Sequence, residues 1–515
     1  MSENLHENCG IAAVYIKENG NGEAANKALF YLYKLLLNLQ NRGQLSAGVT
    51  TYNPHREQLL DTHRDLGPVN EVFKTSDREQ SLKIFKRYAG TKGIGHVRYA
   101  TSGSEERGYA QPFERHHGKL WKWFSFCFNG NLANYTVLKK NLEKLGYYMT
   151  HQADTEVIMH YLSKEFAPKK KPDLVKVFSN LARIFDGMYN IAFINADGDI
   201  IVARDPYGFR PLVYGFNDSI FMAASESNAL INCGITDYKP LEPGHLIWVR
   251  NGSIKVHKFA ESKGTAHCMF EWVYFSNVSS VNDGKPVYVS RTKLGKELAK
   301  LETEKATNEH IVVPVPDTAK AAGDAFAYEL GIPSREGLIR NRYVGRTFIE
   351  GGSREDRIQN KFTALPEVLE GKKVLLVDDS IVRGTTTKEI IKYLKEVGKA
   401  KEIHLRISCP PIRGPCFYGI DMSTISELLV PRYEGKPISG DVSPEILKKI
   451  AKDVGADSLQ YQTVKDLIDA IGVPEEGLCT ACITGTYPTK MGKKLYDKAW
   501  DNYRKGIKDR TYSCG

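Results

Sequence analysis

Short apolar runs separated by polar turns dominate the first half of the chain. Successive runs occupy residues 189–195, 200–204, 212–214, 220–224 and 245–249. Turn-forming residues such as Asp197-Gly198-Asp199 stand between them. Runs of this length, bounded by turns and with few helical patterns among them, predict strands of packed antiparallel sheets.

The second half alternates buried strands with amphipathic helices. The run Ile311–Val315 precedes a polar loop and an Ala-rich helix, and the run Val374–Val377 precedes a second polar loop. A short, wholly apolar run predicts a strand that is buried on both faces. The next helix should end at Gly398, with one apolar face formed by Ile390, Ile391, Leu394 and Val397. This alternation predicts a parallel sheet covered by helices on both faces, with a site at the carboxyl ends of its strands.

Length and composition place the chain among multidomain globular proteins. It has 515 residues, of which 42% are hydrophobic and 26% charged, so we expect at least two domains. The polar stretch Glu261–Thr265 is the expected boundary between residues 9–260 and residues 261–515. No apolar run approaches the about 20 residues that span a bilayer, and residues 1–8 carry no Lys or Arg. We therefore expect a cytoplasmic protein without a secretory signal or membrane contact.

The charge of the chain bears on its partners. The formal net charge of +10 suits either nucleic acid or a polyanionic small substrate. Lysines and arginines are dispersed along the chain, and no zinc-finger, RRM or KH signature accompanies them. We therefore expect small anionic substrates and no nucleic acid.

The stretch Val374–Thr387, which reads VLLVDDSIVRGTTT, carries the chemistry of the second half. Its strand ends in two adjacent carboxylates, Asp378 and Asp379, and a loop containing Gly384 leads into the helix. Helix N-termini bind phosphate, and carboxylates accept hydrogen bonds from ribose hydroxyls or hold Mg²⁺. A bare acidic pair would more often be a solvated turn. The whole ordered string, however, resembles the phosphoribosyl pyrophosphate (PRPP) motif of type I phosphoribosyltransferases.

Several motifs of the first half resemble the N-terminal-nucleophile glutaminase domain of class II glutamine amidotransferases. Cys9 opens the run Cys9–Val14, and alone it would be interpreted as a buried structural thiol. The accompanying segments are Leu39–Gln44, Gly95–Thr101, Phe128–Leu132 and Gln152–Glu156. The resemblance extends from Cys9 to about residue 240. It is specific because these segments occur together and in this order.

The resemblance to these glutaminases implies how glutamine would be attacked. The thiol of Cys9 would attack the side-chain amide, and the base would be the free α-amino group of the same residue. An amino terminus with a pKa near ~8 can act at neutral pH, whereas an interior amide nitrogen cannot. Cys9 must then become the first residue, which makes residues 1–8 a propeptide removed by self-cleavage.

The same resemblance assigns the groups that hold the substrate. Arg98 and Thr101 would bind the α-carboxylate side of glutamine, and Asp154 its ammonium group. Asn129 and the backbone N–H of Gly130 would form the oxyanion hole. Taken one at a time, these residues could equally be a surface ion pair and an Asn-Gly turn.

The second half resembles one family in particular, since Asn341–Ile349 is similar to a stretch specific to glutamine PRPP amidotransferases. The resemblance implies an α+β glutaminase domain with four αββα layers, followed by an α/β phosphoribosyltransferase domain with a parallel sheet. One Mg²⁺ per PRPP site would be held by Thr318, Asp378 and Asp379; Thr318 could otherwise be a helix cap. Residues 350–361 would form a mobile flap. The residues expected to bind PRPP are Asp378, Asp379, Arg383, Gly384, Thr385, Thr386, Thr387 and Lys361.

Nine cysteines in a reducing compartment predict metal binding or catalysis rather than disulfides. Cys479 and Cys482 form a CxxC pair, which alone could be a redox pair or half of a zinc site. The surroundings of four cysteines resemble amidotransferases that carry a 4Fe–4S cluster, for which four thiolates are the right number; they are Cys268, Cys416, Cys479 and Cys482. Cys409 is the alternative ligand because it lies near Cys416. The remaining cysteines, Cys127, Cys233 and Cys514, are expected to bind nothing.

Together these resemblances imply an enzyme that hydrolyses glutamine and transfers the ammonia to PRPP. The products would be 5-phosphoribosylamine, glutamate and pyrophosphate, in the first committed step of purine synthesis. A glucosamine-phosphate synthase would share the first half but carry a sugar-isomerase domain in the second. A non-catalytic PRPP- or nucleotide-binding regulator should have lost Cys9, Arg98 or the acidic pair, and an enzyme that keeps its propeptide would use ammonia only. Relatives imply a homodimer or homotetramer that purine nucleotides inhibit.

Overall fold

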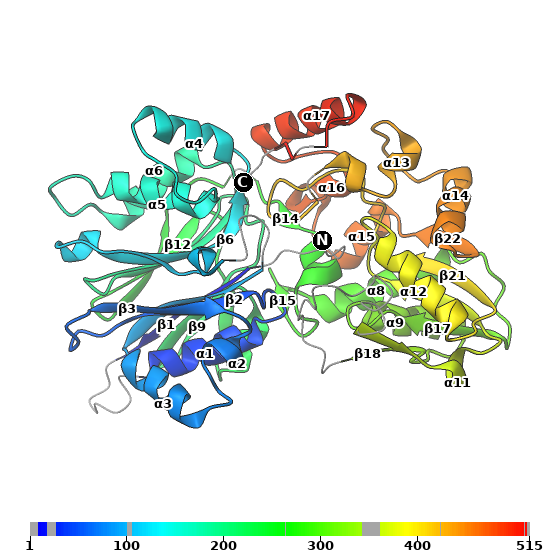
Figure 1. The fold of residues 1–515 in the computed structure, drawn as a ribbon, viewed down its shortest axis with the longest axis horizontal. Helices are drawn as coiled ribbons and strands as arrows, with labels where there is room; N and C mark the ends of the chain where they lie inside the picture. Colours follow the sequence, from blue (N-terminus) through cyan, green and yellow to red (C-terminus); the bar gives the residue numbers. More distant parts are fainter. Residues whose placement is uncertain are drawn as a thin grey trace.

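The chain forms two lobes that lie side by side (Figure 1). The computed structural model describes residues 9–17, 27–99, 106–262, 264–341, 361–422, 424–508 and 510–511. The predicted propeptide, Thr101, most of the predicted flap and Cys514 lie outside these ranges. Among the described residues, no helix has the length and apolarity that a membrane crossing requires.

Two antiparallel sheets form the first lobe. The strands of the first sheet are β1 (Gly10–Ile16), β2 (Ser46–Tyr52), β3 (Leu60–Leu66), β4 (Lys92–Arg98), β9 (Val213–Phe216), β10 (Ile220–Ala224) and β11 (Tyr238–Pro240). They are arranged in the order β11-β9-β10-β1-β4-β2-β3. The strands of the second sheet are β5 (Phe113–Arg115), β6 (Phe124–Leu132), β7 (Gly187–Asn195), β8 (Ile200–Arg204), β12 (His245–Arg250) and β13 (Ser253–Lys258). Their order is β13-β12-β8-β7-β6-β5.

The alternation of side chains along β1 shows why these sheets stack. Ile11, Ala13 and Tyr15 point into the core between the two sheets, where they meet apolar residues of β7, β8 and β12. Ala12, Val14 and Ile16 point the other way and pack against helix α1 (Ala28–Asn38). Both faces are apolar because helices cover the outside of each sheet.

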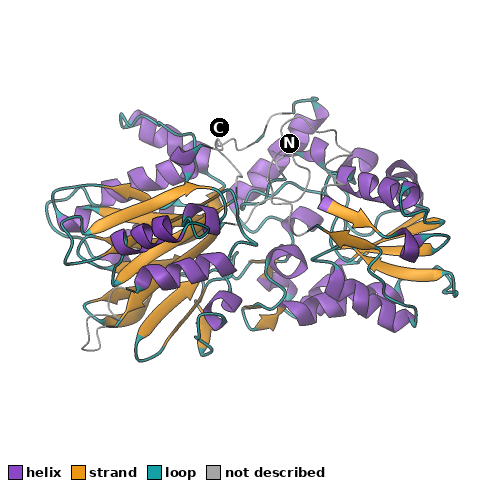
Figure 2. Cartoon of the chain, turned by 60° about the horizontal axis from the view of Figure 1, so that its bottom comes forward, coloured by secondary structure: helices purple, strands orange, loops and turns teal. Residues whose placement is uncertain are grey.

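The outer layers complete the four-layer αββα arrangement that the resemblance predicted. Beside α1, the first sheet carries α2 (Val69–Val72), α3 (Arg78–Arg87) and α7 (Ser227–Ile231). The second sheet is covered by α4 (Tyr135–Lys144), α5 (Asp154–Glu165) and α6 (Leu174–Ile184). Figure 1 shows the two sheets between their helices, and Figure 2 shows the same helices and strands from another side. The predicted fold class of this half is confirmed.

The second lobe contains a four-stranded parallel sheet in the order β17-β20-β21-β22. Its strands are β17 (His310–Pro314), β20 (Lys373–Asp378), β21 (Glu402–Ile407) and β22 (Ser458–Tyr461). Helices α8 (Val287–Lys300) and α9 (Lys320–Leu330) pack on one face. Helices α12 (Thr385–Glu396) and α14 (Pro444–Val454) pack on the other. This is the covered parallel sheet that the alternation of strands and helices predicted.

Short elements complete the second lobe. The strand pairs are β14 (His267–Cys268) with β23 (Leu478–Cys479), β15 (Val281–Asn282) with β16 (Lys285–Pro286), and β18 (Leu338–Arg340) with β19 (Phe362–Ala364). The other helices are α11 (Pro366–Leu369), α13 (Pro431–Glu434), α15 (Val464–Ile471), α16 (Ala481–Thr484) and α17 (Lys490–Arg504). The pair β18–β19 brackets the predicted flap.

Two expectations from the sequence differ from the structure. Val397 was expected on the buried face of its helix, but α12 ends at Glu396 and Val397 is 40% exposed. Because the helix ends at Glu396, its last buried residue is Leu394 and Val397 falls on the C-cap. The alternative that Asn129 and Gly130 form a hairpin turn is wrong, because both residues lie inside β6.

Candidate active sites

Cys9 lies immediately before the first residue of β1. The register of β1 with β4, in which Gly10 faces Val97, places Cys9 across from Arg98. Its Sγ lies 3.9 Å from the carbonyl oxygen of Tyr99, and the residue is partly exposed. Burial raises the pKa of the Cys127 thiol well above its usual value, so that thiol stays protonated. Of these two neighbouring cysteines, Cys9 is the one that a substrate can reach.

Arg98 and Asp154 come together beside Cys9 although they are far apart in the sequence. Arg98 is the last residue of β4, Asp154 is the first residue of α5, and each is 5% exposed. Burial raises the pKa of Asp154 to about 7, against the opposing effects of the Leu132 N–H and the Arg98 charge. A cation next to Asp154 would offset the burial and favour its carboxylate form.

The loop between α1 and β2 passes directly behind Arg98. A Cβ at Gly43 would lie 2.5 Å from the carbonyl carbon of Arg98, so only glycine fits this approach. The segment Leu39–Gln44 of the motif set therefore packs against the backbone of Arg98, a predicted site residue.

Asn129 and Gly130 lie near the end of β6. The side-chain nitrogen of Asn129 is buried and has no hydrogen-bond partner among the residues that the structure describes. A buried amide donor without a partner is costly unless a ligand accepts from it. A Cβ at Gly130 would lie 2.1 Å from the carbonyl oxygen of Met188, so the backbone here admits no larger residue. Both features suit an oxyanion hole.

Two buried side chains, His96 and Gln111, hold the residue before Asn129. Phe128 donates its N–H to Oε1 of Gln111 over 2.7 Å, and its carbonyl oxygen accepts from Nε2 of Gln111 over 3.3 Å. Nε2 of His96 donates to the same carbonyl oxygen over 3.1 Å. Burial and the Arg98 charge lower the pKa of His96 to about 3, so its ring is neutral. His96 belongs to the Gly95–Thr101 motif, whereas nothing in the sequence marked Gln111.

In the second lobe, Thr318 and the acidic pair meet at the carboxyl ends of β17 and β20. Thr318 donates to Oδ2 of Asp379, and Ser380 donates to Oδ1 of the same residue over 2.7 Å. Thr318 does not cap α9, which begins at Lys320 and has Ala319 at its N-cap. Burial raises the pKa of Asp378, where the Asp379 charge adds to the effect, and also that of Asp379. Two adjacent carboxylates, of which Asp379 is buried and Asp378 partly buried, favour a bound cation.

The loop after the acidic pair leads into α12 as the sequence predicted. Gly384 is the N-cap of α12 and has a φ of +83°, in the left-handed region that favours glycine. Thr385, Thr386 and Thr387 form the first turn, so their backbone N–H groups lie at the positive end of the helix dipole. This geometry suits a phosphate group.

The structure places the two basic residues predicted to bind PRPP in different surroundings. The charge of Lys361 acts on both Asp378 and Asp379 and favours their ionised forms. The guanidinium of Arg383 instead donates to Glu427, over 3.0 Å from Nε. That side chain is therefore held against the loop after β21 in the described conformation.

The four cysteines predicted to bind a cluster come together from three segments. The parallel pair β14–β23 aligns Cys268 with Cys479. A small apolar cavity is lined by all four thiols, together with Met188, Phe209, Tyr418, Ile420, Ala481 and Tyr487. Tyr418 donates its backbone N–H to Sγ of Cys416 over 3.3 Å. Cys409 is buried but does not line this cavity.

Each half of the chain matches a known domain family. Residues 96–232 match the model of the glutamine amidotransferase domain, and residues 290–415 match that of the phosphoribosyl transferase domain. The chain is 37% identical to amidophosphoribosyltransferase of Methanothermobacter thermautotrophicus, over 95% of this chain and 96% of that protein. The chain belongs to the amidophosphoribosyltransferase family.

Other relatives agree with this assignment. The amidophosphoribosyltransferase of Bacillus subtilis is 36% identical over 95% of each protein. A solved structure, glutamine PRPP amidotransferase from B. subtilis complexed with ADP and GMP, matches with a TM-score of 0.79 at 35% identity. The match covers 94% of this chain and 98% of that one.

Membership of the amidophosphoribosyltransferase family confirms three predictions. The resemblance was correctly identified, the fold class is right for both halves, and the chain is a transferase with a glutamine amidotransferase domain and a phosphoribosyltransferase domain. The alternative of a glucosamine-phosphate synthase is excluded by the second domain. The boundary at residues 260 and 261 and the roles of individual residues stay predictions.

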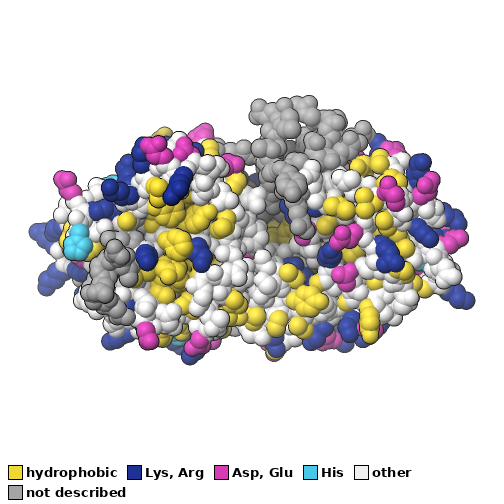
Figure 3. Space-filling model, turned by 90° about the horizontal axis from the view of Figure 1, so that it is seen from below, with side chains coloured by type: hydrophobic (Ala, Val, Ile, Leu, Met, Phe, Trp, Pro, Cys, Tyr) yellow, Lys and Arg dark blue, Asp and Glu magenta, His cyan; other side chains and the backbone are white. Residues whose placement is uncertain are grey.

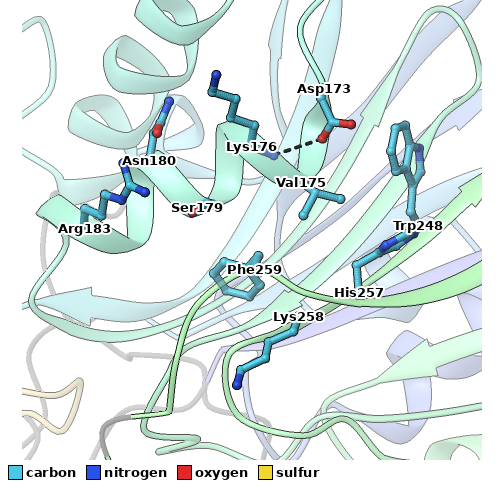
Figure 4. A pocket seen from close by; sticks show the side chains of 10 residues that line it. All are labelled: Asp173, Val175, Lys176, Ser179, Asn180, Arg183, Trp248, His257, Lys258 and Phe259. Carbon is cyan, nitrogen blue, oxygen red and sulfur yellow. Dashed lines mark hydrogen bonds between the residues drawn. The ribbon is translucent and has the colours of Figure 1, made fainter.

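A hollow on the outer side of the amidotransferase lobe lies away from these residues. It is formed between α6 and the β12–β13 hairpin, where Phe259 and Trp248 stand among Lys176, Arg183 and Lys258 (Figure 4). None of the predicted site residues lines it. The candidate chemistry is therefore assigned to the Cys9 and Asp378–Asp379 sites.

Proposed function

We propose that this member of the amidophosphoribosyltransferase family hydrolyses glutamine at Cys9 and passes the ammonia to PRPP at the Asp378–Asp379 site. One observation carries the proposal: a single chain holds a reachable thiol beside Arg98 and Asp154, and an acidic pair followed by a phosphate-binding helix N-terminus. The products are glutamate, 5-phosphoribosylamine and pyrophosphate. This is the first committed step of purine synthesis.

The glutaminase step uses groups of the first lobe only. The α-amino group of Cys9 takes the thiol proton, sulfur bonds to the amide carbon, and the leaving ammonia receives that proton. Asn129 and the N–H of Gly130 stabilise the oxyanion, while Arg98 and Asp154 hold the α-carboxylate and the ammonium of glutamine. Water then hydrolyses the thioester. The donor of Asn129 that lacks a partner supports its role, and Thr101 completes the proposed glutamine-binding set.

The transfer step belongs to the second lobe. The nitrogen of ammonia bonds to C1 of the ribose as the C1–O bond to pyrophosphate breaks, and a proton is then released. Backbone N–H groups at Gly384–Thr387 bind the 5-phosphate, and Lys361 supplies positive charge near the acidic pair. Arg383 is proposed to join the site after leaving Glu427. No protein nucleophile is needed, because positioning and charge neutralisation carry the reaction.

The residues of the second lobe fit one Mg²⁺ for each PRPP. Asp378, Asp379 and Thr318 would hold it, together with oxygens of the substrate, since Mg²⁺ in phosphate sites takes one or two carboxylates from the protein. In the described residues, no group of three or more His, Cys, Asp or Glu side chains is arranged to hold a metal. When bound, Mg²⁺ would stabilise the departing pyrophosphate.

The thiol cavity fits a 4Fe–4S cluster. Cys268, Cys416, Cys479 and Cys482 surround an apolar space rather than a point, which suits a cluster whose irons and sulfides fill the centre. Burial raises the pKa of all four thiols, so thiolates would be unfavourable there without a strong positive charge. The backbone N–H that Tyr418 donates to Sγ of Cys416 is a kind of hydrogen bond that tunes the reduction potential of such clusters. The cluster would link the segments that carry its ligands.

The remaining partners are proposed from the relatives. A solved relative is complexed with ADP and GMP, which supports inhibition of this chain by purine nucleotides. Large apolar side chains are exposed on the surface, among them Phe30, Tyr288 and Tyr328, and Figure 3 shows apolar side chains on the underside of both lobes. We propose a homodimer or homotetramer that works in the cytoplasm, without nucleic acid or a membrane.

The proposal is tested by measuring pyrophosphate release from PRPP with either glutamine or ammonium as nitrogen donor. Wild type should use both donors, Cys9→Ala only ammonium, and Asp378→Ala/Asp379→Ala neither. Glutamine use that survives Cys9→Ala would refute the nucleophile, and release unaffected by the double variant would refute the PRPP site. Intact mass should show a chain that begins at Cys9; a chain that begins at Met1 would favour the ammonia-only enzyme.

The cluster has its own test. Protein purified without oxygen should contain about four irons and four sulfides per chain and absorb broadly in the visible range. Cys416→Ser should lower both contents, whereas Cys233→Ser should leave them unchanged. Zinc in place of iron would contradict the cluster.

A further inference from the structure

The segment Cys416–Gly419 of the second lobe lies directly against the oxyanion strand of the first. Nδ2 of Asn131 donates to the carbonyl oxygen of Phe417 over 2.9 Å, and this bond is buried. Asn131 follows Gly130 in β6, and β6 lies on the side of the first lobe toward the second (Figure 1). The two bonded residues are 286 positions apart in the sequence. One hydrogen bond therefore ties the residue next to the proposed oxyanion hole to the other lobe.

Gly419 brings the same segment within van der Waals reach of the oxyanion strand. A Cβ at Gly419 would lie 3.0 Å from Cε of Met188, 3.7 Å from Cβ of Asn131 and 3.8 Å from the carbonyl carbon of Gly130. The φ of Gly419 is +98°, which strains any other residue. A Cβ here would crowd the end of the Met188 side chain and make ordinary contacts with Asn131 and Gly130, so the segment lies close to the oxyanion strand.

Further contacts fix the segment from its other side. Arg210 donates from Nη2 to the carbonyl oxygen of Gly419 over 3.3 Å, and its Nε lies 3.1 Å from Sδ of Met188. The rings of Phe209 and Tyr418 stack with their centroids 4.5 Å apart. Because Phe417 is fully buried as well, the acceptor that Asn131 uses belongs to a well-held piece of chain.

We propose that Asn131 is a positioning residue of the glutaminase reaction, which holds the N–H of Gly130 in place through the carbonyl oxygen of Phe417. Asn131 touches neither substrate nor nucleophile; it acts on the residue that does. The inference rests on the proposed role of Asn129 and Gly130 as the oxyanion hole. Because Cys416 lines the thiol cavity, that cavity and the oxyanion strand share one segment of the second lobe.

The proposal predicts a selective loss when the donor of Asn131 is removed. Asn131→Asp keeps the size of the side chain but cannot donate, and Asn131→Ala removes the group. Removing an oxyanion donor itself costs about 10²–10³ in kcat, so displacing one should lower the kcat of glutamine use by about tenfold. The glutamine KM should change by less than about twofold, because Arg98 and Asp154 set it. The ammonium-dependent rate should not change.

Asn134 offers a matched control on the same side of the lobe. Its Nδ2 donates to the carbonyl oxygen of Ile184 over 2.7 Å, and that bond stays within the amidotransferase lobe. Asn134→Ala should lower the melting temperature at least as much as Asn131→Ala, yet leave the ratio of glutamine-dependent to ammonium-dependent rates unchanged. A purely structural role for Asn131 would give the two variants the same pattern.

Gly419→Ala tests the inference from the other lobe, since its Cβ would crowd Met188, the partner of Asn131 across β6 and β7, and its positive φ would strain the segment. It should reproduce the selective fall in glutamine kcat. The inference is overturned if Asn131→Asp and Asn131→Ala keep the wild-type ratio of the two rates, whether the rates stay the same or fall together. Asn129→Ala distinguishes failure of the positioning role of Asn131 from failure of the proposed oxyanion hole. If Asn129→Ala also leaves glutamine use intact, the proposed oxyanion hole is wrong. If it abolishes glutamine use, only the role of Asn131 fails.

Discussion

At the scale of single residues, Asp154 makes glutamine binding depend on pH. Burial raises its pKa to about 7, so its carboxyl group is largely neutral below that pH when no ligand is bound. Only the ionised form attracts the ammonium of glutamine. Affinity should therefore weaken as the pH falls from about 8 to about 6, approaching tenfold per unit once below the pKa.

The measurement for Asp154 is the competitive inhibition constant of L-norleucine, a glutamine analogue with an inert side chain. Its α-carboxylate and ammonium keep their charges throughout this range, so the change reports on the protein. Asp154→Asn should bind weakly and lose this pH dependence. An inhibition constant for wild type that stays flat from about pH 6 to about pH 8 would contradict the assignment.

Gln111 is the residue whose loss should most directly misplace Asn129 without touching substrate. It holds both backbone groups of Phe128, and Gln111→Leu removes both bonds while keeping the volume. The kcat of glutamine use should fall about tenfold, less than for an oxyanion donor itself, with ammonium use unchanged. The matched control is Gln462→Leu, since Gln462 donates to the carbonyl oxygen of Leu294 inside the second lobe. Equal effects of the two variants on the ratio of rates would refute the role.

At the scale of elements, the start of α12 depends on the backbone of Gly384. Its φ of +83° would cost an alanine roughly 1–2 kcal/mol, and a Cβ would lie 3.1 Å from the methyl groups of Leu429. Because the first turn of α12 is the proposed phosphate site, Gly384→Ala should raise the KM for PRPP about tenfold, as one lost charge-assisted contact would. The glutaminase rate without PRPP should stay the same.

Gly455 provides the comparison for Gly384, since it has a φ of +84° and ends α14 in the same lobe. Among the residues that the structure describes, its Cβ would meet only Ile391, at 3.5 Å. Gly455→Ala should cost similar stability in thermal melting but leave the KM for PRPP unchanged. If both variants raise that KM alike, the effect is one of stability and the phosphate site is misassigned.

Some elements and site residues could be predicted from the sequence, and others could not. The strands Ile200–Arg204 and Ile220–Ala224 match the predicted runs residue for residue, because polar, turn-forming residues stand at both ends of each run. The acidic pair, Gly384 and α12 were predictable because their chemistry is local. Gln111 and Asn131 were not, because each acts through a partner distant in the sequence. Arg383 carried a motif signal, yet its ion pair with Glu427 depends on a loop that no pattern located.

At the scale of the whole molecule, a buried network of charges joins the two lobes. Arg42 of the first lobe pairs with Glu226 over 2.5 Å and with Glu271, in the segment leading to the second, over 2.6 Å. Arg210 pairs with Glu271 over 2.6 Å. All four side chains are at most 1% exposed. Two positive and two negative charges balance, so each partner compensates a charge that burial would otherwise make costly.

Removing one charge should therefore weaken the joint between the lobes. Glu271→Gln leaves Arg42 and Arg210 with one carboxylate between them, and an uncompensated buried charge costs about 3–5 kcal/mol. We expect thermal unfolding to split into two transitions, one for each lobe, when followed by calorimetry. Glu302→Gln breaks the buried pair with Arg406 inside the second lobe and should shift a single transition without splitting it.

The difference between wild type and Glu271→Gln should also shrink in acid. Burial opposes the ionisation of Glu271, but Arg42 and Arg210 outweigh it and lower its pKa from 4.5 to about 2. A carboxyl whose pKa is depressed in the folded state stabilises the fold above its ordinary pKa, and this contribution is lost as the pH falls toward the depressed value. Wild type should lose that stability between about pH 5 and about pH 2, whereas the glutamine variant has none to lose. Denaturant unfolding at several pH values measures both, and a difference that stays constant across this window would show that Glu271 does not carry its charge in the folded protein.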